Sequence, residues 1–434
     1  MTADRASSSF PDRKVLIAIA VIPSIDCICN QLNNALQIHL GPVSFLQAIR
    51  AFLLLAFAVV GARALWRNPS HAVRIPLPAI GAALILGIAV SKEFLVTGAL
   101  SMESLSAYGQ MAYWVMLWTT VSILCWNRAQ AELLLKGLSV GACLTAVSVI
   151  IGLFVGAGNY YKDDSVQASA GWFDTAKMIT GVLVVGGVVT LYLGRNSRSW
   201  IPTLAAGLCF VACILTYARA GSVALIVVVA WLVLWRFLIR RRGEGRWLNR
   251  FLILVLAGCI LAPLAVNMHA LLARWSDVGN SDKAGSGRAT FWKVAVNAYV
   301  AEDLPQQTFG IGYKAMSEML FRDYGDDIKH THNDMLDLLL VGGFVGAIWL
   351  ISLVGAFAWR ALLPSPRSAA GAAAAAILLG YLCHSQLTGQ IWGTDAMTYY
   401  TVSLTCLTRM THQNLVSAPV QDTTFGHREV LAQI

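Results

Sequence analysis

The residues Lys329-His330-Thr331-His332-Asn333-Asp334 end a long polar segment, and Met335-Leu336-Asp337-Leu338-Leu339-Leu340-Val341-Gly342-Gly343 begin an apolar one. Asn333 and Asp334 are residue types that cap helices, so the pattern predicts a membrane helix that starts directly after His332. The unpaired N–H groups at a helix start are electropositive and favour an uncharged imidazole. A neutral imidazole accepts a proton, which makes His332 a candidate general base. The alternative is an interfacial histidine that only caps the helix.

The composition is that of an integral membrane protein. Of the 434 residues, 57% are hydrophobic and 13% are charged, and the mean hydropathy is +0.63. This is far too little charge for a soluble surface of this size. Apolar runs that can cross a hydrocarbon core of roughly 30 Å recur along nearly the whole chain. We therefore expect an all-α, polytopic protein of about twelve transmembrane helices.

Connections that are rich in basic residues alternate along the chain with connections that carry few of them. We expect the spans at residues 15–32, 43–62, 75–97, 108–126, 133–156, 178–194, 200–217, 222–239, 250–267, 335–359, 370–388 and 391–408. Basic residues gather in alternate connections, and the positive-inside rule then puts both termini in the cytoplasm. The run Arg240-Arg241-Arg242 is interpreted as an anchor to anionic lipid, and no nucleic-acid motif is present. The nine cysteines lie inside apolar runs, so no disulfide framework is indicated.

The spans divide the chain into four parts. We expect nine membrane helices in 1–267, one large periplasmic loop in 268–334, three membrane helices in 335–408 and a cytoplasmic tail in 409–434. In the loop, the segment 291–300 has an apolar face at helical spacing and predicts a helix in the membrane interface. A second short helix is expected after Phe309-Gly310-Ile311-Gly312, where the glycines allow a tight turn.

Two arginines on the predicted outer side are candidate anion-binding residues. Arg219 lies in a very short turn between two apolar runs, and Arg288 follows Gly287 just before the expected interfacial helix. Guanidinium groups fit phosphate oxygens and stay charged at any relevant pH. With His332 they predict a site from which pyrophosphate departs. The alternatives are that Arg219 extends to lipid headgroups and that Arg288 is an ordinary loop residue.

Further polar residues are candidates for auxiliary roles or metal binding. Arg50 sits about two turns inside the second span, where it either contacts ligand or pairs with Asp26. His330, Asn333 and Lys314 are the other auxiliary candidates. The pattern His330-x-His332-x-Asp334, with Asp326 and Asp327 nearby, could hold a metal. Because the sequence contains no Asp-x-Asp and the first outer loop, around 31–42, carries no carboxylate, we do not expect catalysis through bound magnesium or manganese. No metal and no cofactor are expected.

With these residues in view, the chain resembles the O-antigen ligase family, within the group that also contains O-antigen polymerases and bacterial protein O-oligosaccharyltransferases. Three separated motifs carry the resemblance: Ala218-Arg219-Ala220-Gly221, Gly287-Arg288 followed by Trp292, and His332-Asn333-Asp334-Met335-Leu336 with Gly343 and Gly346 downstream. Ala218 stands where serine is common in that family.

The resemblance implies an inverting, metal-independent glycosyltransferase of the membrane-embedded C-type architecture, in the bacterial inner membrane with its active site facing the periplasm. Its donor would be undecaprenyl-pyrophosphate-linked O-antigen, and its acceptor a sugar hydroxyl of the lipid A core in lipopolysaccharide biosynthesis. His332 would take the acceptor proton, and Arg219 and Arg288 would stabilise the leaving pyrophosphate.

Three other functions are open. An O-antigen polymerase tends to carry two sizeable external loops, whereas the second candidate here, 157–177, has only about twenty residues. A protein O-oligosaccharyltransferase usually has an extra C-terminal external domain, whereas this sequence ends in a short polar tail. A transporter of lipid-linked glycans would need broken or charged helices near the midplane and an inverted repeat, and no convincing repeat is present. Gly181, Gly186 and Gly187 favour close helix packing instead.

Overall fold

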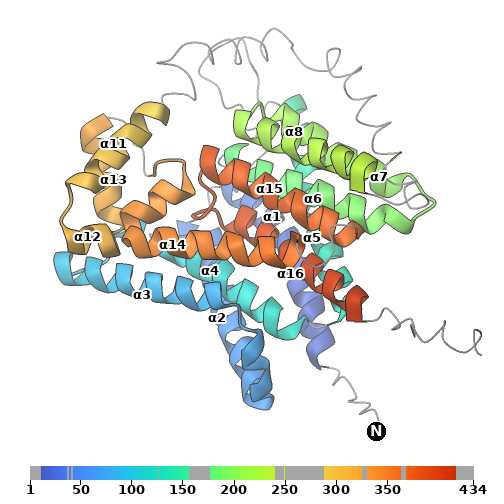
Figure 1. Ribbon diagram of the computed structural model, residues 1–434, viewed down its shortest axis with the longest axis horizontal. Coiled ribbons are helices and arrows are strands. Elements are labelled where there is room, and N and C mark those ends of the chain that lie inside the picture. The colour runs from blue at the N-terminus through green and yellow to red at the C-terminus, as the bar shows by residue number, and fades with distance from the viewer. Residues whose placement is uncertain are drawn as a thin grey trace, which may run out of the picture.

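The fold was determined from a computed structural model. It describes residues 11–36, 39–40, 43–125, 127–155, 176–239, 249, 288–324, 330–362 and 368–416. This part of the chain is a bundle of helices with one antiparallel pair of two-residue strands, β1 (His39–Leu40) and β2 (Val43–Ser44) (Figure 1). The predicted all-α class is confirmed.

The helices follow the expected order of spans. The long helices are α1 (Pro11–Leu36), α2 (Phe45–Arg67), α3 (Leu77–Thr97), α4 (Met102–Leu124), α5 (Arg128–Val155), α6 (Ala176–Leu193), α7 (Ile201–Leu215), α8 (Arg219–Leu234), α14 (Asp334–Leu362), α15 (Ala369–Leu387) and α16 (Thr394–Val416). Short helical turns η1 (Pro69–Arg74), η2 (Gly194–Asn196) and η3 (Trp235–Ile239) follow α2, α6 and α8. The predicted span 250–267 lies outside the described residues.

Seven segments are long and apolar enough to cross a membrane. They are Phe45–Arg67, Leu77–Leu95, Arg128–Val155, Ile179–Asn196, Arg219–Phe237, Asp334–Trp359 and Ala369–Leu387. The chain is therefore a multi-pass membrane protein. The apolar helix α7 is shorter than these, and the count of twelve crossings stays a prediction.

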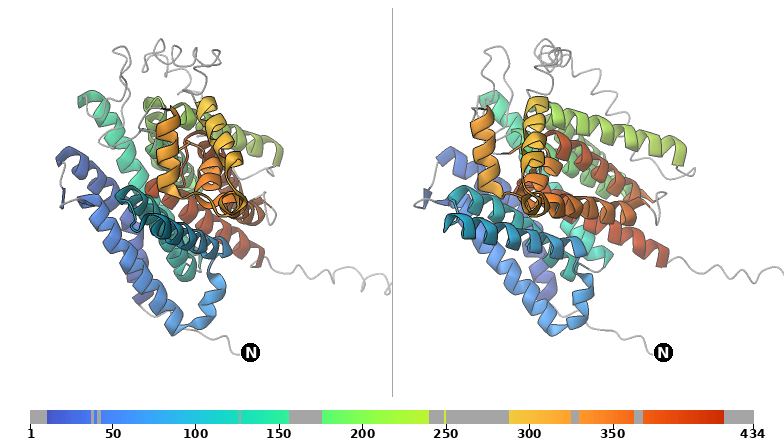
Figure 2. Two further views of the ribbon diagram at one scale, coloured as in Figure 1. Left: turned by 90° about the vertical axis from the view of Figure 1, so that its left-hand side faces the viewer. Right: turned by 60° about the vertical axis from the view of Figure 1, so that its left-hand side comes forward.

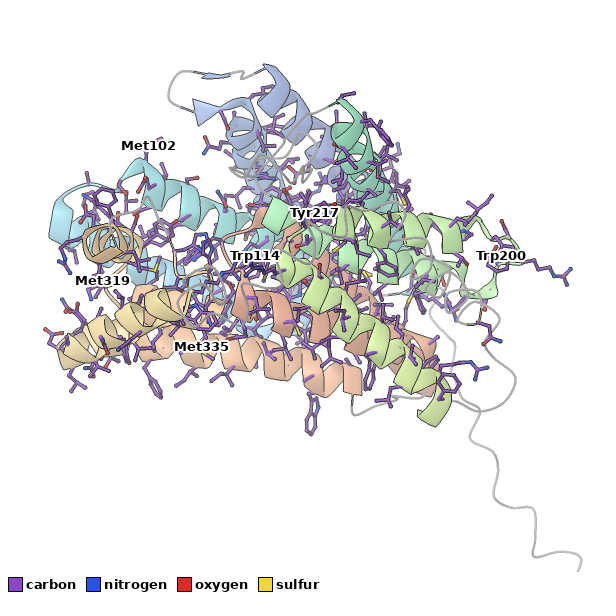
Figure 3. All side chains as sticks on the ribbon, turned by 90° about the horizontal axis from the view of Figure 1, so that it is seen from above. Met102, Trp114, Trp200, Tyr217, Met319 and Met335 are labelled. Atoms are coloured by element: carbon purple, nitrogen blue, oxygen red, sulfur yellow. The ribbon has the colours of Figure 1, made fainter. Side chains whose placement is uncertain are left out.

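Small residues bring the inner helices into close contact, as the sequence predicts. A Cβ added at Gly186 would lie 2.0 Å from the Cβ of Ala142 on α5, and one at Gly187 would lie 2.3 Å from the ring of Phe210 on α7. Backbones approach closely wherever such glycines face a neighbouring helix, which is how helices associate in lipid. Figure 3 shows the side chains that fill the remaining space, with Met102 and Met319 at one end and Trp200 at the other.

Three shorter helices, α11 (Arg288–Ala301), α12 (Leu304–Phe309) and α13 (Tyr313–Tyr324), gather at one end of the bundle (Figures 1 and 2). α11 covers the predicted segment 291–300, and α13 begins directly after Gly310-Ile311-Gly312, so both helices are confirmed. Placement of these helices on the periplasmic side remains a prediction.

A loop before α13 joins this end to a break in α14. Gly343 has a φ of +64°, which interrupts the helical hydrogen bonding. The N–H groups of Ile311 and Gly312 donate to the carbonyl oxygens of Leu340 (2.6 Å) and Val341 (3.3 Å). Irregular backbone inside a membrane protein is tolerated where neighbouring protein groups supply such bonds. α14 and the α12–α13 loop therefore form one hydrogen-bonded unit.

Candidate active site

The segment that carries His332 is held in an unusual backbone conformation. His332 has a φ of +60°, in the left-handed region that residues with a Cβ rarely adopt. Immediately before it, the buried Thr331 donates from its N–H (2.6 Å) and its hydroxyl (2.7 Å) to Oδ1 of Asp337. Across from it, a Cβ on Gly389 would lie 3.3 Å from the His332 Cα. Surrounding contacts thus fix a strained residue, an arrangement that is concentrated at functional sites.

Asn333 caps α14, as predicted. Its Oδ1 accepts from the N–H groups of Met335 (3.0 Å) and Leu336 (3.2 Å), which satisfies two donors of the first turn. Its amide nitrogen donates to Oε1 of Gln386 (3.1 Å) at the end of α15. The cap therefore also ties the His332 segment to a second membrane helix.

Asp334 has a different role from the capping that its residue type suggests. Its buried carboxyl group accepts from the N–H groups of Gln390 (2.5 Å) and Ile391 (2.8 Å) and from the hydroxyl of Tyr381 (3.2 Å). The connection between α15 and α16 is thereby held against the start of α14. Since that connection also contains Gly389, Asp334 helps to fix the wall that faces His332.

His330 lies directly against His332. The two imidazole centroids are 4.3 Å apart with ring planes at 81°, and the His332 N–H donates to Nδ1 of His330 at 3.3 Å. The same Nδ1 is 3.6 Å from Oδ2 of Asp337, which is fully buried and also accepts from the indole N–H of Trp392 at 3.1 Å. The predicted auxiliary residue His330 is thus beside the predicted base.

The start of α11 points at the same segment. The indole N–H of Trp292 donates to the carbonyl oxygen of Thr331 at 3.2 Å. Arg288 is four residues earlier, at the first position of α11, and side chains four residues apart lie on the same face of a helix. Arg288 is thus one helical turn from a residue that touches the neighbour of His332, and it is partly buried.

Arg219 is the first residue of α8 and lies two residues after Tyr217, whose φ of +51° makes the tight turn. Two residues later, a Cβ on Gly221 would lie 2.6 Å from the Thr180 methyl group on α6, so the α8 backbone packs directly against the Thr180 side chain. The Thr180 hydroxyl is 3.0 Å from Nε2 of His384, in the last turn of α15. The start of α8 is therefore connected, through α6, to the end of α15. The same end of α15 accepts the hydrogen bond from the Asn333 side chain.

The two other auxiliary candidates lie elsewhere. Arg50 forms ion pairs with Asp26 (3.1 Å) and with Asp395, so of the two alternatives considered from the sequence the structure shows the pairing with Asp26. Lys314 pairs with Glu318 (3.7 Å) on α13. Within the described residues, their ion pairs are with these carboxylates and not with the His332 segment.

The carboxylates near His332 are already engaged. Within the described residues, no group of three or more His, Cys, Asp or Glu side chains could hold a metal ion. Asp334 is turned toward the α15–α16 connection and Asp337 toward Thr331 and Trp392. Asp326 and Asp327, the other ligands considered from the sequence, lie outside the described residues.

Two residues near His332 are not identified as candidate site residues from the sequence motifs. Asp337 carries a signal that could identify it, since a carboxylate inside an apolar helix is a functional candidate in itself. Trp392 offers no such signal in the sequence. It is located by its bond to Asp337 and by its ring contact with Tyr313, whose centroid is 5.1 Å away. Burial raises the pKa of the Tyr313 phenol, which therefore stays protonated at neutral pH.

The comparison with known families covers this site. Residues 204–351 match the family model described as O-antigen ligase. The match runs from α7 into α14 and includes Arg219, Arg288, His332 and the break at Gly343. No curated protein matches the chain. The match to residues 204–351, about a third of the chain, supports the O-antigen ligase family.

Proposed function

We propose that this protein is an O-antigen ligase of the bacterial inner membrane. It transfers O-antigen polysaccharide from undecaprenyl pyrophosphate to a sugar hydroxyl of the lipid A core, by an inverting reaction that uses no metal. The family match supports a ligase-type or polymerase-type transferase in general. The ligase assignment, the two lipid-linked substrates and the periplasmic position of residues 268–334 are part of the proposal, as are the membrane helices in 1–267 and 335–408 and the cytoplasmic tail 409–434.

The observation that carries the proposal is the held conformation of His332. Its left-handed backbone is fixed by Thr331 and Asn333 on either side, and α11 brings Arg288 to within one turn of a direct contact with this segment. A general base and an anion-binding group that are positioned in advance are what a transfer from pyrophosphate needs.

In the proposed reaction, a neutral His332 imidazole takes the proton of the acceptor hydroxyl. The acceptor oxygen attacks the anomeric carbon from the face opposite the pyrophosphate, so the new bond forms as the old one breaks and the configuration inverts. Arg288 and Arg219 stabilise the charge on the leaving pyrophosphate, each by about 10²- to 10³-fold in rate by analogy with other electrostatic sites. His330 shares its environment with Asp337 and positions the His332 ring.

A transporter of lipid-linked glycans is the second candidate, because α14 is broken at Gly343 and transporters use broken helices. Here, however, the freed carbonyls of Leu340 and Val341 are occupied by the N–H groups of Ile311 and Gly312. They are thus engaged by protein and are not directed at a ligand. The segment 157–177, on which the comparison with polymerases depends, lies largely outside the described residues.

The experiment is a transfer assay with purified protein in nanodiscs, lipid-linked donor, lipid A-core acceptor and a chelator. Wild type is compared with His332→Ala, Arg288→Ala and Arg219→Ala, with Arg198→Ala before α7 as the matched control. We expect transfer in chelator, its loss in the His332 variant, a rate lowered about 10²- to 10³-fold in the two arginine variants and the wild-type rate in the control.

Each other result has a distinct meaning. Elongation of the donor glycan without use of the acceptor would make the protein a polymerase. Movement of donor across the bilayer without any transfer would make it a transporter. A requirement for divalent metal, or an active His332 variant, would refute the mechanism.

A further inference from the structure

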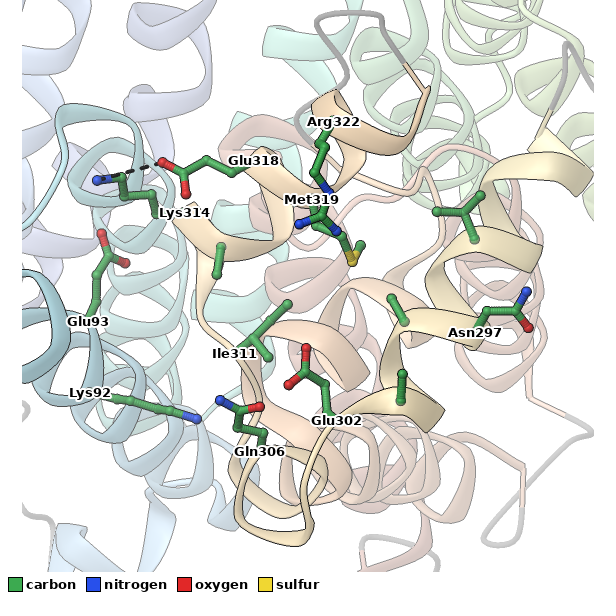
Figure 4. Close-up of a pocket in the computed structure, with 14 residues that line it drawn as sticks. Lys92, Glu93, Asn297, Glu302, Gln306, Ile311, Lys314, Glu318, Met319 and Arg322 are labelled. Carbon is green, nitrogen blue, oxygen red and sulfur yellow. Dashed lines mark ion pairs between the residues drawn. The ribbon is translucent and has the colours of Figure 1, made fainter.

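A cavity of about 1000 Å³ opens among α3, α11, α12 and α13 (Figure 4). Its polar lining consists mainly of Lys92, Glu93, Glu302, Gln306, Lys314 and Arg322. The volume is at the upper end of the roughly 300–1,000 Å³ typical of pockets for small organic ligands. The cavity can therefore hold a ligand of several sugar rings.

The cavity is separated from His332 by the thickness of α11. Trp292 contacts the Thr331 carbonyl, whereas Val294 and Ala301 of the same helix line the cavity. At 3.6 residues per turn, these two residues point about 160–180° away from Trp292. The cavity is thus a second site next to the candidate active site, on the far side of a shared helix.

The lining is balanced in charge. Among the described residues, three cationic and three anionic side chains line it, and several are paired with protein groups. The Lys92 ammonium donates to the carbonyl oxygen of Gly310, and the buried Glu93 accepts from the Tyr108 hydroxyl at 3.2 Å. Lys314 pairs with Glu318. The part of the lining that the structure describes therefore has no surplus of positive charge with which to select a polyphosphate.

The mixture of polar groups in the lining suits a ligand with many hydroxyls. A hydroxyl both donates and accepts, so a mixture of carboxylate, amide and guanidinium groups can satisfy it. Figure 4 shows Glu302 and Gln306 on one side of the gap and Arg322 across from them, with Ile311 and Met319 also lining it. Polar groups around an apolar floor are typical of specific small-molecule sites.

We propose that this cavity binds an uncharged stretch of sugar chain from one of the glycan substrates, away from the bond that is formed. The proposal rests on the proposed function for the identity of the glycan. Binding energy gained from a part of the substrate that does not react can be used to hold the reacting end in place. A longer glycan should accordingly be a better substrate than a truncated one.

The test is direct binding of the dephosphorylated, lipid-free glycan that mild acid releases from the lipopolysaccharide of the parent bacterium. Calorimetry in nanodiscs compares wild type with Ala301→Trp and Ala315→Trp, which fill the cavity from exposed positions on α11 and α13. Ala129→Trp, at an exposed position in the first turn of α5, is the matched control. We expect affinity to fall about tenfold in both filled variants and to stay at the wild-type value in the control.

Glu302→Gln tests the charge argument with almost no change in volume. For a neutral glycan, the carboxylate is a strong acceptor and its loss weakens binding several-fold. For a polyanionic ligand, removing a negative charge would tighten binding instead. Tighter binding of phosphorylated glycan to Glu302→Gln would therefore overturn the proposal.

The remaining outcomes separate this inference from the proposed function. If the wild type binds the glycan but transfers none, and Ala315→Trp does not bind it, the cavity proposal is supported and the ligase function is refuted. Normal transfer with equal binding in all variants would refute the cavity alone. A zwitterionic phospholipid that co-purifies with wild type and is lost from Ala315→Trp, with glycan binding unchanged, would assign the cavity to lipid and overturn the inference.

Discussion

The carboxyl group of Asp334 is the point at which the wall opposite His332 can be loosened by one substitution. In Asp334→Ala, the buried N–H groups of Gln390 and Ile391 and the Tyr381 hydroxyl lose their acceptor. A buried polar group left without a partner costs about 1–3 kcal/mol. The two backbone donors cannot turn away, whereas the hydroxyl can, so we expect a loss of about 2–6 kcal/mol in the free energy of unfolding.

The assay is reversible unfolding by SDS in mixed micelles, followed by the fluorescence of the protein's 14 tryptophans. Asp334→Asn is the matched control, because its amide oxygen can still accept from both backbone N–H groups, and it should cost only about 1 kcal/mol. Transfer activity should fall in the alanine variant even at temperatures where the protein stays folded. A free energy of unfolding for Asp334→Ala within about 0.5 kcal/mol of wild type would refute the reasoning, as would equal losses in the two variants.

Three further substitutions test other parts of the structure. Gly343→Ala should lower the free energy of unfolding in SDS by more than about 3 kcal/mol, because residue 343 has a positive φ and the added Cβ would lie 2.3 Å from a carbonyl oxygen. Gly355→Ala in the same helix is the control: its added Cβ meets open space, so the variant should be neutral or stabilising by up to about 1 kcal/mol. Arg50→Leu should lower the free energy of unfolding by about 3–5 kcal/mol, because the carboxylates of Asp26 and Asp395 lose their cation. Replacing both aspartates by asparagine in that variant should restore most of the lost unfolding free energy and of the lost purified yield. Trp292→Phe should lose one hydrogen bond, worth about 1 kcal/mol, and lower the transfer rate at unchanged affinity for the donor; unchanged transfer would contradict a role for α11 in placing Arg288.

Local features of the chain are predictable from the sequence. Hydropathy places helices close to where the structure has them, because the period and length of apolar runs are local properties. The cap at Asn333 and the helix after Gly310-Ile311-Gly312 follow from residue chemistry alone. The pairing of Arg50 with Asp26 could be anticipated, since a charge inside a span needs a partner.

The site itself depends on contacts between residues far apart in the chain. Asp334 binds Gln390 and Ile391, more than fifty residues later, and no pattern around Asp334 indicates those partners. The positive φ of His332 is likewise imposed from outside, since the intrinsic preference of histidine is for negative φ. The sequence could therefore name the reactive residue types, but the tertiary packing decides which of them meet.

The hydrogen bonds between the α12–α13 loop and α14 bear on the order of assembly. The ribosome makes α11, α12 and α13 before α14, yet the N–H groups of Ile311 and Gly312 find their acceptors only on α14. Those three helices must therefore wait for α14 to be inserted in the bilayer before their connection can adopt its final conformation. In a newly made chain, the connection beside the His332 segment therefore cannot reach its final conformation before α14 is in place.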